Sequence, residues 1–96
     1  MTEMTALEMR QAEVDQYSAN IAMYTTILAT LPTEWPERLQ AYKGSTDKHA
    51  AIATVEDMAD VELLAALWQA DDCKAAIRTE TLERTKAAAI LAVLSA

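Results

Sequence analysis

The chain has 96 residues, 52 % hydrophobic and 24 % charged, a composition that supports one modest folded core and is unlike that of disordered proteins. Fifteen acidic against eight basic side chains give a net charge of −7, which argues against nucleic acid and anionic membrane surfaces as partners. A single glycine, a single histidine and a single cysteine exclude glycine-rich nucleotide loops, the H-E-x-x-H zinc motif, cysteine metal ribbons and the C-x-x-C redox pair.

The amino-acid composition of the chain favours helices throughout. Turn formers are scarce, with one glycine and two prolines, and phenylalanine is absent, whereas alanine, leucine, glutamate, methionine and glutamine abound. No stretch alternates polar and apolar residues as a strand would. We therefore expect one all-α domain over residues 1–96. Its architecture would be an elongated helical hairpin or bundle, with long N- and C-terminal helices and one or two short helices between them.

The first predicted helix spans residues 4–31 and carries the clearest pattern in the sequence. Apolar residues recur there with alternating spacings of three and four, which is typical of a helix that packs lengthwise against another helix. The residues of this stripe are Leu7, Val14, Tyr17, Ile21, Tyr24, Leu28 and Leu31. Together with Trp35, an aromatic residue of the kind that anchors interfaces, they are the predicted interaction residues.

The middle of the chain predicts two short helical segments. Pro32 ends the first helix, Thr33 is the expected N-cap of a short helix over residues 33–43, and Pro36 fits its first turn. Gly44 occupies the position where a left-handed C-cap is expected.

Ser45, Thr46 and Asp47 are three adjacent cap-type residues, so a further helical turn or two is expected over residues 48–53, after which Thr54 offers another cap. From residue 56 to about 94 the chain lacks glycine and proline, so one long helix is expected, with Asp71-Asp72 as the only interruption that the sequence allows.

This last helix changes character along its length. Its first half carries an apolar stripe made of Leu63, Leu67, Ala70, Cys73 and Ile77. Residues 78–86 have only Leu82 as a large apolar side chain, so we expect them to face solvent or to make contacts. Residues 87–94 are apolar nearly all round.

The lengths of the two predicted long helices bear on oligomeric state. A compact chain of this size has a radius of gyration of about 12.5 Å, whereas 28 helical residues alone extend about 42 Å. Either the monomer is an elongated hairpin or a second copy completes the core. The sequence favours the second copy, because the polar residues 78–86 cannot cover the whole apolar stripe. A homo-oligomer is therefore expected.

Few features of the sequence suggest a catalytic, metal or cofactor site. The acidic residues Glu56, Asp57, Asp60 and Glu62 could form a cation site or mimic DNA, but acidic residues that begin a helix more often offset its dipole and aid solubility. We interpret Cys73 as a small buried residue and His49 as a solvated one. No catalytic residue, metal ligand or cofactor site is predicted, and the protein is not expected to be an enzyme.

The function expected from these features is that of a small, non-enzymatic, cytoplasmic interaction module that modulates or scaffolds a protein partner. A first alternative is an acidic inhibitor that mimics nucleic acid through residues 56–62 and Asp71-Asp72. A second is a small DNA-binding regulator that uses residues 38–49. No family's diagnostic motif is present. The overall style, with the segment LPTEWPERL leading into a long helix, is similar to the small accessory proteins of temperate phages and bacterial mobile elements.

Overall fold

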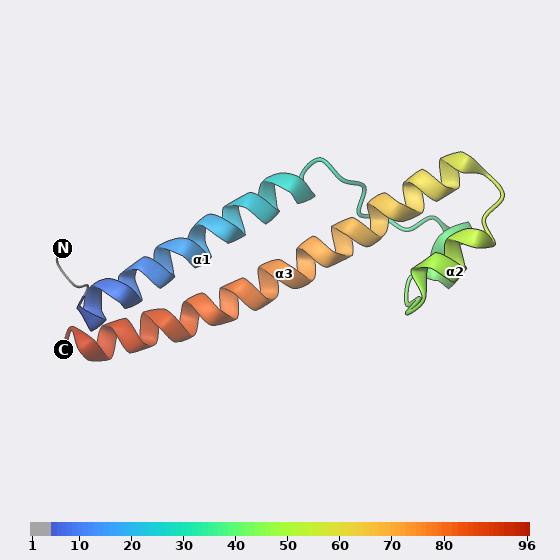
Figure 1. The fold of residues 1–96 in the computed structure, drawn as a ribbon. Helices are drawn as coiled ribbons and strands as arrows, with labels where there is room; N and C mark the ends of the chain where they lie inside the picture. The colour runs from blue at the N-terminus through green and yellow to red at the C-terminus, as the bar shows by residue number, and fades with distance from the viewer. Residues whose placement is uncertain (1–4) are drawn as a thin grey trace.

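A computed structural model describes residues 5–96 and shows a long hairpin of two helices. Two short helices pack against one end of it, and together they are called the helical cap below. Helix α1 (Ala6–Leu28) packs antiparallel against α3 (Met58–Leu94), while the 3₁₀ helix η1 (Glu37–Tyr42) and the short helix α2 (Lys48–Ala53) lie between them in sequence (Figure 1). Figure 1 also shows the start of α1 and the end of α3 at the same end of the hairpin. The predicted fold class, with two long and two short helices, is confirmed.

The molecule is elongated. Its principal extents are 58 × 25 × 23 Å and its radius of gyration is 18.9 Å, against about 12.5 Å for a compact chain of this length. The 37 residues of α3 account for this shape, because at 1.5 Å per residue they extend about 55 Å. Within residues 5–96 no helix is long and apolar enough to cross a membrane.

Helix α1 is shorter than the periodic pattern indicated. It begins after Thr5, whose side-chain oxygen accepts a hydrogen bond from the backbone N–H of Glu8 at 3.1 Å. It ends at Leu28. The N–H of Ala29 still bonds back four residues to Thr25, whereas the N–H groups of Thr30 and Leu31 reach back only three residues in tight turns. Of the residues predicted to belong to this helix, 29–31 thus lie outside it and Met4 lies outside the described residues.

The prediction of a helix over residues 33–43 was wrong in its bounds. Only Glu37–Tyr42 are helical, as a 3₁₀ helix, and Thr33 does not cap it because Pro36 occupies the N-cap position. A proline disfavours helical backbone in the residue before it, which here is Trp35. Residues 32–36 therefore run without regular structure.

Gly44 does not form the predicted left-handed cap, because its φ angle is not positive. The chain turns after η1 by a bond from the N–H of Ser45 to the carbonyl of Tyr42, at 3.1 Å, which needs no left-handed residue.

Helix α2 was predicted correctly, and Asp47 caps it by accepting a hydrogen bond from the N–H of Ala50 at 3.0 Å. The cap expected at Thr54 was wrong. Asp57 instead caps α3, accepting from the N–H of Ala59 at 2.9 Å. From there α3 runs without interruption through Asp71-Asp72.

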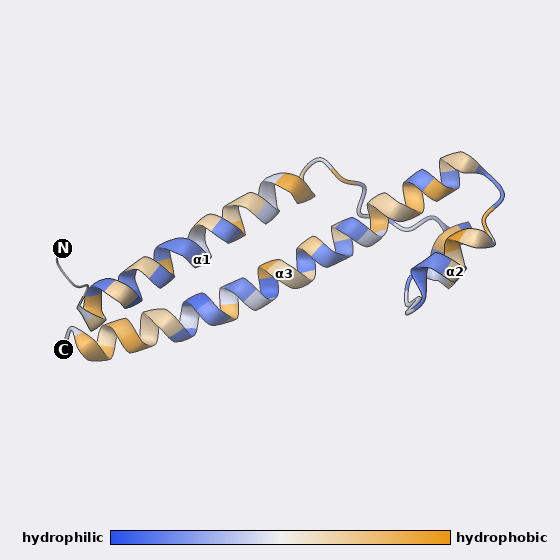
Figure 2. Ribbon diagram, in the orientation of Figure 1, coloured by the Kyte–Doolittle hydropathy of each residue, from blue (hydrophilic) through white to orange (hydrophobic). Residues whose placement is uncertain are grey.

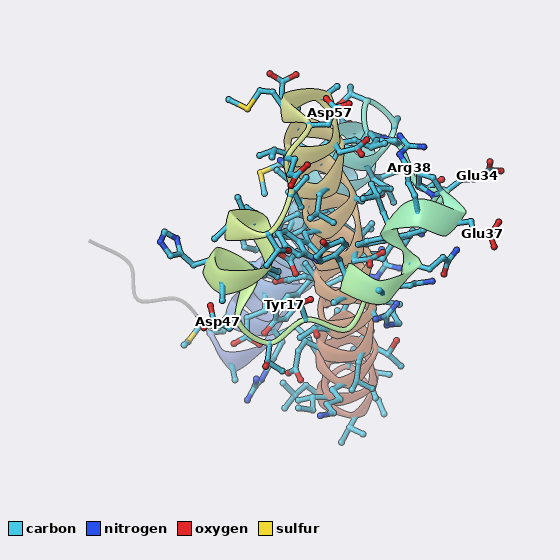
Figure 3. The ribbon with its side chains drawn as sticks, turned by 90° about the vertical axis from the view of Figure 1, so that its right-hand side faces the viewer. Tyr17, Glu34, Glu37, Arg38, Asp47 and Asp57 are labelled. Atoms are coloured by element: carbon cyan, nitrogen blue, oxygen red, sulfur yellow. The ribbon has the colours of Figure 1, made fainter. Side chains whose placement is uncertain are left out.

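The main core lies where the cap meets the first half of α3. It consists of Trp35, Leu39, Leu64, Leu67 and Trp68, with Tyr42, Ala51, Ile52, Val55 and Leu63 packed around it. Viewed along the long axis in Figure 3, η1 and α2 lie on opposite sides of α3, so the two short helices of the helical cap hold this helix between them. The indole N–H of Trp68 donates to the Tyr42 carbonyl at 3.2 Å and ties η1 to α3.

Candidate interaction surface

The predicted stripe of α1 lies against α3 of the same chain. Its five residues from Val14 to Leu28 are half-buried, as is Leu31 beyond the end of the helix, whereas Leu7 is exposed, and no residue of α1 is fully buried. On the facing side of α3, Cys73 and Ala87 are buried, which confirms the interpretation of Cys73. The stripe therefore forms the intramolecular seam, and one neighbouring helix leaves all of its side chains partly accessible.

Trp35 does not belong to this seam. It is only 9 % exposed and packs in the core formed by the cap. Its indole N–H is buried, and no hydrogen-bond partner for it is found among residues 5–96. By contrast, Trp68 is buried with its N–H satisfied. Trp35 therefore contributes to the stability of the cap rather than to an exposed surface.

A polar connection crosses the middle of the hairpin. The side-chain amide of Gln16 donates to the Asn20 oxygen at 2.8 Å, and the Asn20 amide donates in turn to a Glu80 carboxylate oxygen at 3.3 Å. This chain of hydrogen bonds fixes which part of α1 lies beside which part of α3. Sequence reasoning missed it, although Gln16 and Asn20, two amides one turn apart on the same side of α1, were a signal that could have found it.

A cavity of about 370 Å³ opens at the end of the hairpin where α1 begins and α3 ends. It is lined by Leu7, Glu8, Gln11, Leu91 and Ser95. In the hydropathy colouring of Figure 2, the C-terminal end of α3 is the longest continuous apolar stretch of the hairpin, whereas hydrophilic residues predominate in the part of α3 directly before it. The open end of the hairpin thus combines an apolar surface with incomplete packing.

Large apolar side chains are exposed along the hairpin, each to between 40 and 75 %. They are Leu7, Met9, Met23, Leu82, Ile90, Val93 and Leu94, with Met58 exposed at the other end of α3. The helix from residue 87 onward is apolar nearly all round but has only α1 as a neighbour, so most of its apolar side chains remain in solvent.

Charge is distributed unevenly over the two long helices. Helix α1 carries three acidic and one basic side chain, a net charge of −2. Residues 58–72 of α3 carry four acidic and no basic side chains, whereas residues 74–94 carry four basic and two acidic ones, a net charge of +2. The basic half of α3 is the half beside α1, as the Asn20–Glu80 bond shows. The hairpin therefore pairs an acidic helix with a basic segment.

The acidic cluster at the start of α3 is partly used within the chain. Asp57 caps α3, and Asp60 accepts hydrogen bonds from Arg38 at 2.9 and 3.0 Å. The hydrogen bond with Asp60 and its negative charge raise the pKa of Arg38. Glu56 and Glu62 remain exposed. Residues 5–96 hold no group of His, Cys, Asp and Glu side chains that could bind a metal ion.

Some basic residues of the segment 38–49 also form contacts within the chain. Arg38 is bound to Asp60, and the Lys48 ammonium lies 3.6 Å from an Asp72 carboxylate oxygen and 5.6 Å from the centre of the Trp68 ring. Figure 3 shows Glu34 and Glu37 projecting outward beside Arg38, so acidic groups flank this segment. His49 is exposed, as interpreted from the sequence.

Comparison of the chain with family models, with curated proteins and with solved structures finds no significant match.

Proposed function

We propose that the protein is a non-enzymatic interaction module that binds a protein partner through its two-helix region and modulates or scaffolds that partner. The proposal is supported by the surface that the fold leaves uncovered. The accessible surface is 6756 Å², roughly a quarter more than the ~5,400 Å² of a compact monomer of this mass. The excess, about 1,300 Å², exceeds the ~800 Å² that one partner contributes to an interface of standard size.

The character of this surface supports a protein partner rather than nucleic acid. Methionine, isoleucine, leucine and valine side chains are exposed along the hairpin, where they can be buried against a complementary apolar surface. Methionine suits such a surface because its side chain adapts to the shape that it meets. The overall charge of −7 opposes binding to a phosphate backbone.

Affinity capture from cells that produce the protein, carried out at about 0.1 M and about 1 M salt, tests the proposal. Apolar contacts survive this change, whereas contacts between exposed charges weaken as the Debye length falls from about 10 to about 3 Å. We expect a protein partner that is retained at both salt concentrations. A partner that acts on nucleic acid and is released at high salt would support the acidic mimic instead. Retention of the protein on DNA at low salt would support the DNA-binding regulator.

A further inference from the structure

The hairpin has two long flanks, one on each side of the plane that contains the α1 and α3 axes. The hydrogen bond from Asn20 to Glu80 marks one of them. Residues one helical turn or seven positions apart share a face of a helix. Gln16 and Met23 therefore lie beside Asn20 on this side of α1, and Met9 lies seven residues before Gln16. Met9, Gln16 and Met23 are all exposed.

The same reasoning assigns residues of α3 to this flank. Ala76 lies one turn before Glu80, Glu83 one turn after it, and Ile90 a further seven residues on. Because the helices are antiparallel and Asn20 lies beside Glu80, Met9 lies within one residue of the level of Ile90, Gln16 within one residue of Glu83, and Met23 within one residue of Ala76. These three pairs form what we call the Met9–Ile90 flank, which has apolar side chains at both ends and a polar pair between them.

We propose that a second copy of this chain covers the Met9–Ile90 flank. The two hairpins lie side by side with their open ends together, so that α1 of each copy packs between its own α3 and the α3 of the other, forming a four-helix bundle. This inference rests on the proposed function and names the partner of the two-helix region. The uncovered surface is large enough, since about 1,300 Å² of excess area per chain would give a dimer interface of ~2,600 Å², in the range of permanent homodimers.

Charge decides the orientation. A two-fold axis along the hairpin brings α1, with its net charge of −2, onto residues 74–94 of the other copy's α3, with a net charge of +2. A two-fold axis across the hairpin would instead place α1 against α1 of the other copy. It would also place the basic segment, residues 74–94, against the same segment of the other copy, so that like charges face each other. The side-by-side arrangement with open ends together is therefore favoured.

In this orientation, each of the three residue pairs of the Met9–Ile90 flank also faces residues of the second copy with which it can pack or bond. Met9 meets the Ile90 of the second copy, and Met23 meets its Ala76, so both ends of the interface bury apolar groups. Between them, the Gln16 amide can donate to the Glu83 carboxylate of the second copy, which within that copy already has the Lys86 ammonium 3.4 Å away. A polar level flanked by apolar ones disfavours sliding of one hairpin along the other, because a shift would place Glu83 against a methionine.

Light scattering coupled to size exclusion tests the association. We expect about 21 kDa at micromolar concentration, twice the monomer mass of 10.5 kDa. A Met9→Glu/Ile90→Glu double variant should weaken dimerisation by about a hundredfold or more, because each copy would bury two unpaired charges. Leu82→Glu is the matched control, since Leu82 is an exposed apolar residue of the same helix that lies outside the flank. Circular dichroism must show that both variants keep their helices.

The distance between spin labels tests the orientation. With Cys73→Ala removing the native thiol, an Ala96→Cys label sits at the open end of each hairpin. Neighbouring helices in a bundle lie about 8–10 Å apart, so labels at two adjacent open ends should be separated by less than about 25 Å. Reversed hairpins would separate them by at least about 35 Å, the length of α1. A long distance, or a dimer that the double variant leaves intact, overturns the inference.

A monomeric protein also overturns it, and the double variant then shows whether the proposed function fails as well. If the monomer captures a different protein and the Met9→Glu/Ile90→Glu variant loses it, the flank binds that protein and the proposed function stands. If the monomer captures nothing at either salt concentration, both are wrong.

Discussion

Truncation of Leu67 to alanine tests whether the cap and α3 share one core. Leu67 is 0 % exposed and contributes to the cluster that joins η1 and α2 to α3. Removing a fully buried leucine side chain to Cβ usually costs about 3 kcal/mol, the sum of lost apolar burial and the cavity that remains. Leu82→Ala is the matched control in the same helix, because Leu82 is 54 % exposed and its truncation should cost less than about 0.5 kcal/mol.

Urea unfolding at a fixed protein concentration measures both variants. With a slope of about 1–1.5 kcal/mol per molar urea for a protein of this size, Leu67→Ala should lower the midpoint by about 2–3 M. Trp35 and Trp68, the only tryptophans, both lie in the cap core, so their fluorescence reports the cap while far-ultraviolet circular dichroism reports all helices. If Leu67→Ala costs no more than Leu82→Ala, or if it leaves the fluorescence transition unchanged, the cap does not share a core with α3.

Three further predictions follow from individual contacts. Trp68→Phe should cost about 1 kcal/mol more than Trp35→Phe in urea unfolding, because Trp68 donates a hydrogen bond to the Tyr42 carbonyl whereas the buried N–H of Trp35 has no partner among residues 5–96; equal losses would contradict the assigned hydrogen bond. Ile21→Asp places a charge in the half-buried seam and should lower the thermal midpoint of the helical signal by about 10 °C or more, and an unchanged midpoint would mean that the seam does not hold the hairpin together. Reversing the exposed charges with Glu56→Lys and Glu62→Lys should leave partner binding within a few fold in a pull-down titration, whereas its abolition in a folded protein would support nucleic-acid mimicry.

The long helices could be predicted because each carries a pattern that repeats over many turns. The stripe from Val14 to Leu31 and the stripe from Leu67 to Ile77 both depend on the period of the α-helix, which tertiary contacts do not alter. The short segments depend on single residues, and there the outcome varied. Asp47 capped α2 where a cap-type residue was expected, but Gly44 proved to have no left-handed role, because a glycine tolerates that conformation without requiring it.

The candidate surface could be predicted only in part. Periodicity identifies which residues of α1 pack against another helix, but it cannot assign the Asn20–Glu80 contact, which joins residues 60 positions apart. Nor did the net charge of the chain reveal that α3 changes from acidic to basic along its length. That change can be read from the sequence, but its meaning depends on knowing which half of α3 lies beside α1.

An apolar stripe on a helix shows that the helix needs a partner, but it does not say whether one neighbour suffices. In a two-helix hairpin each helix is covered along one line only, and α1 accordingly has no fully buried residue. The cap embraces the first half of α3 and buries Leu64 and Leu67 completely, which shows what a second layer achieves on the same helix. The second half of α3 lacks such a layer, although its last eight residues include only alanine, isoleucine, leucine and valine. Most of these side chains remain in solvent although they match a protein core in composition, and they belong to the surface that we propose a second copy of the chain to bury.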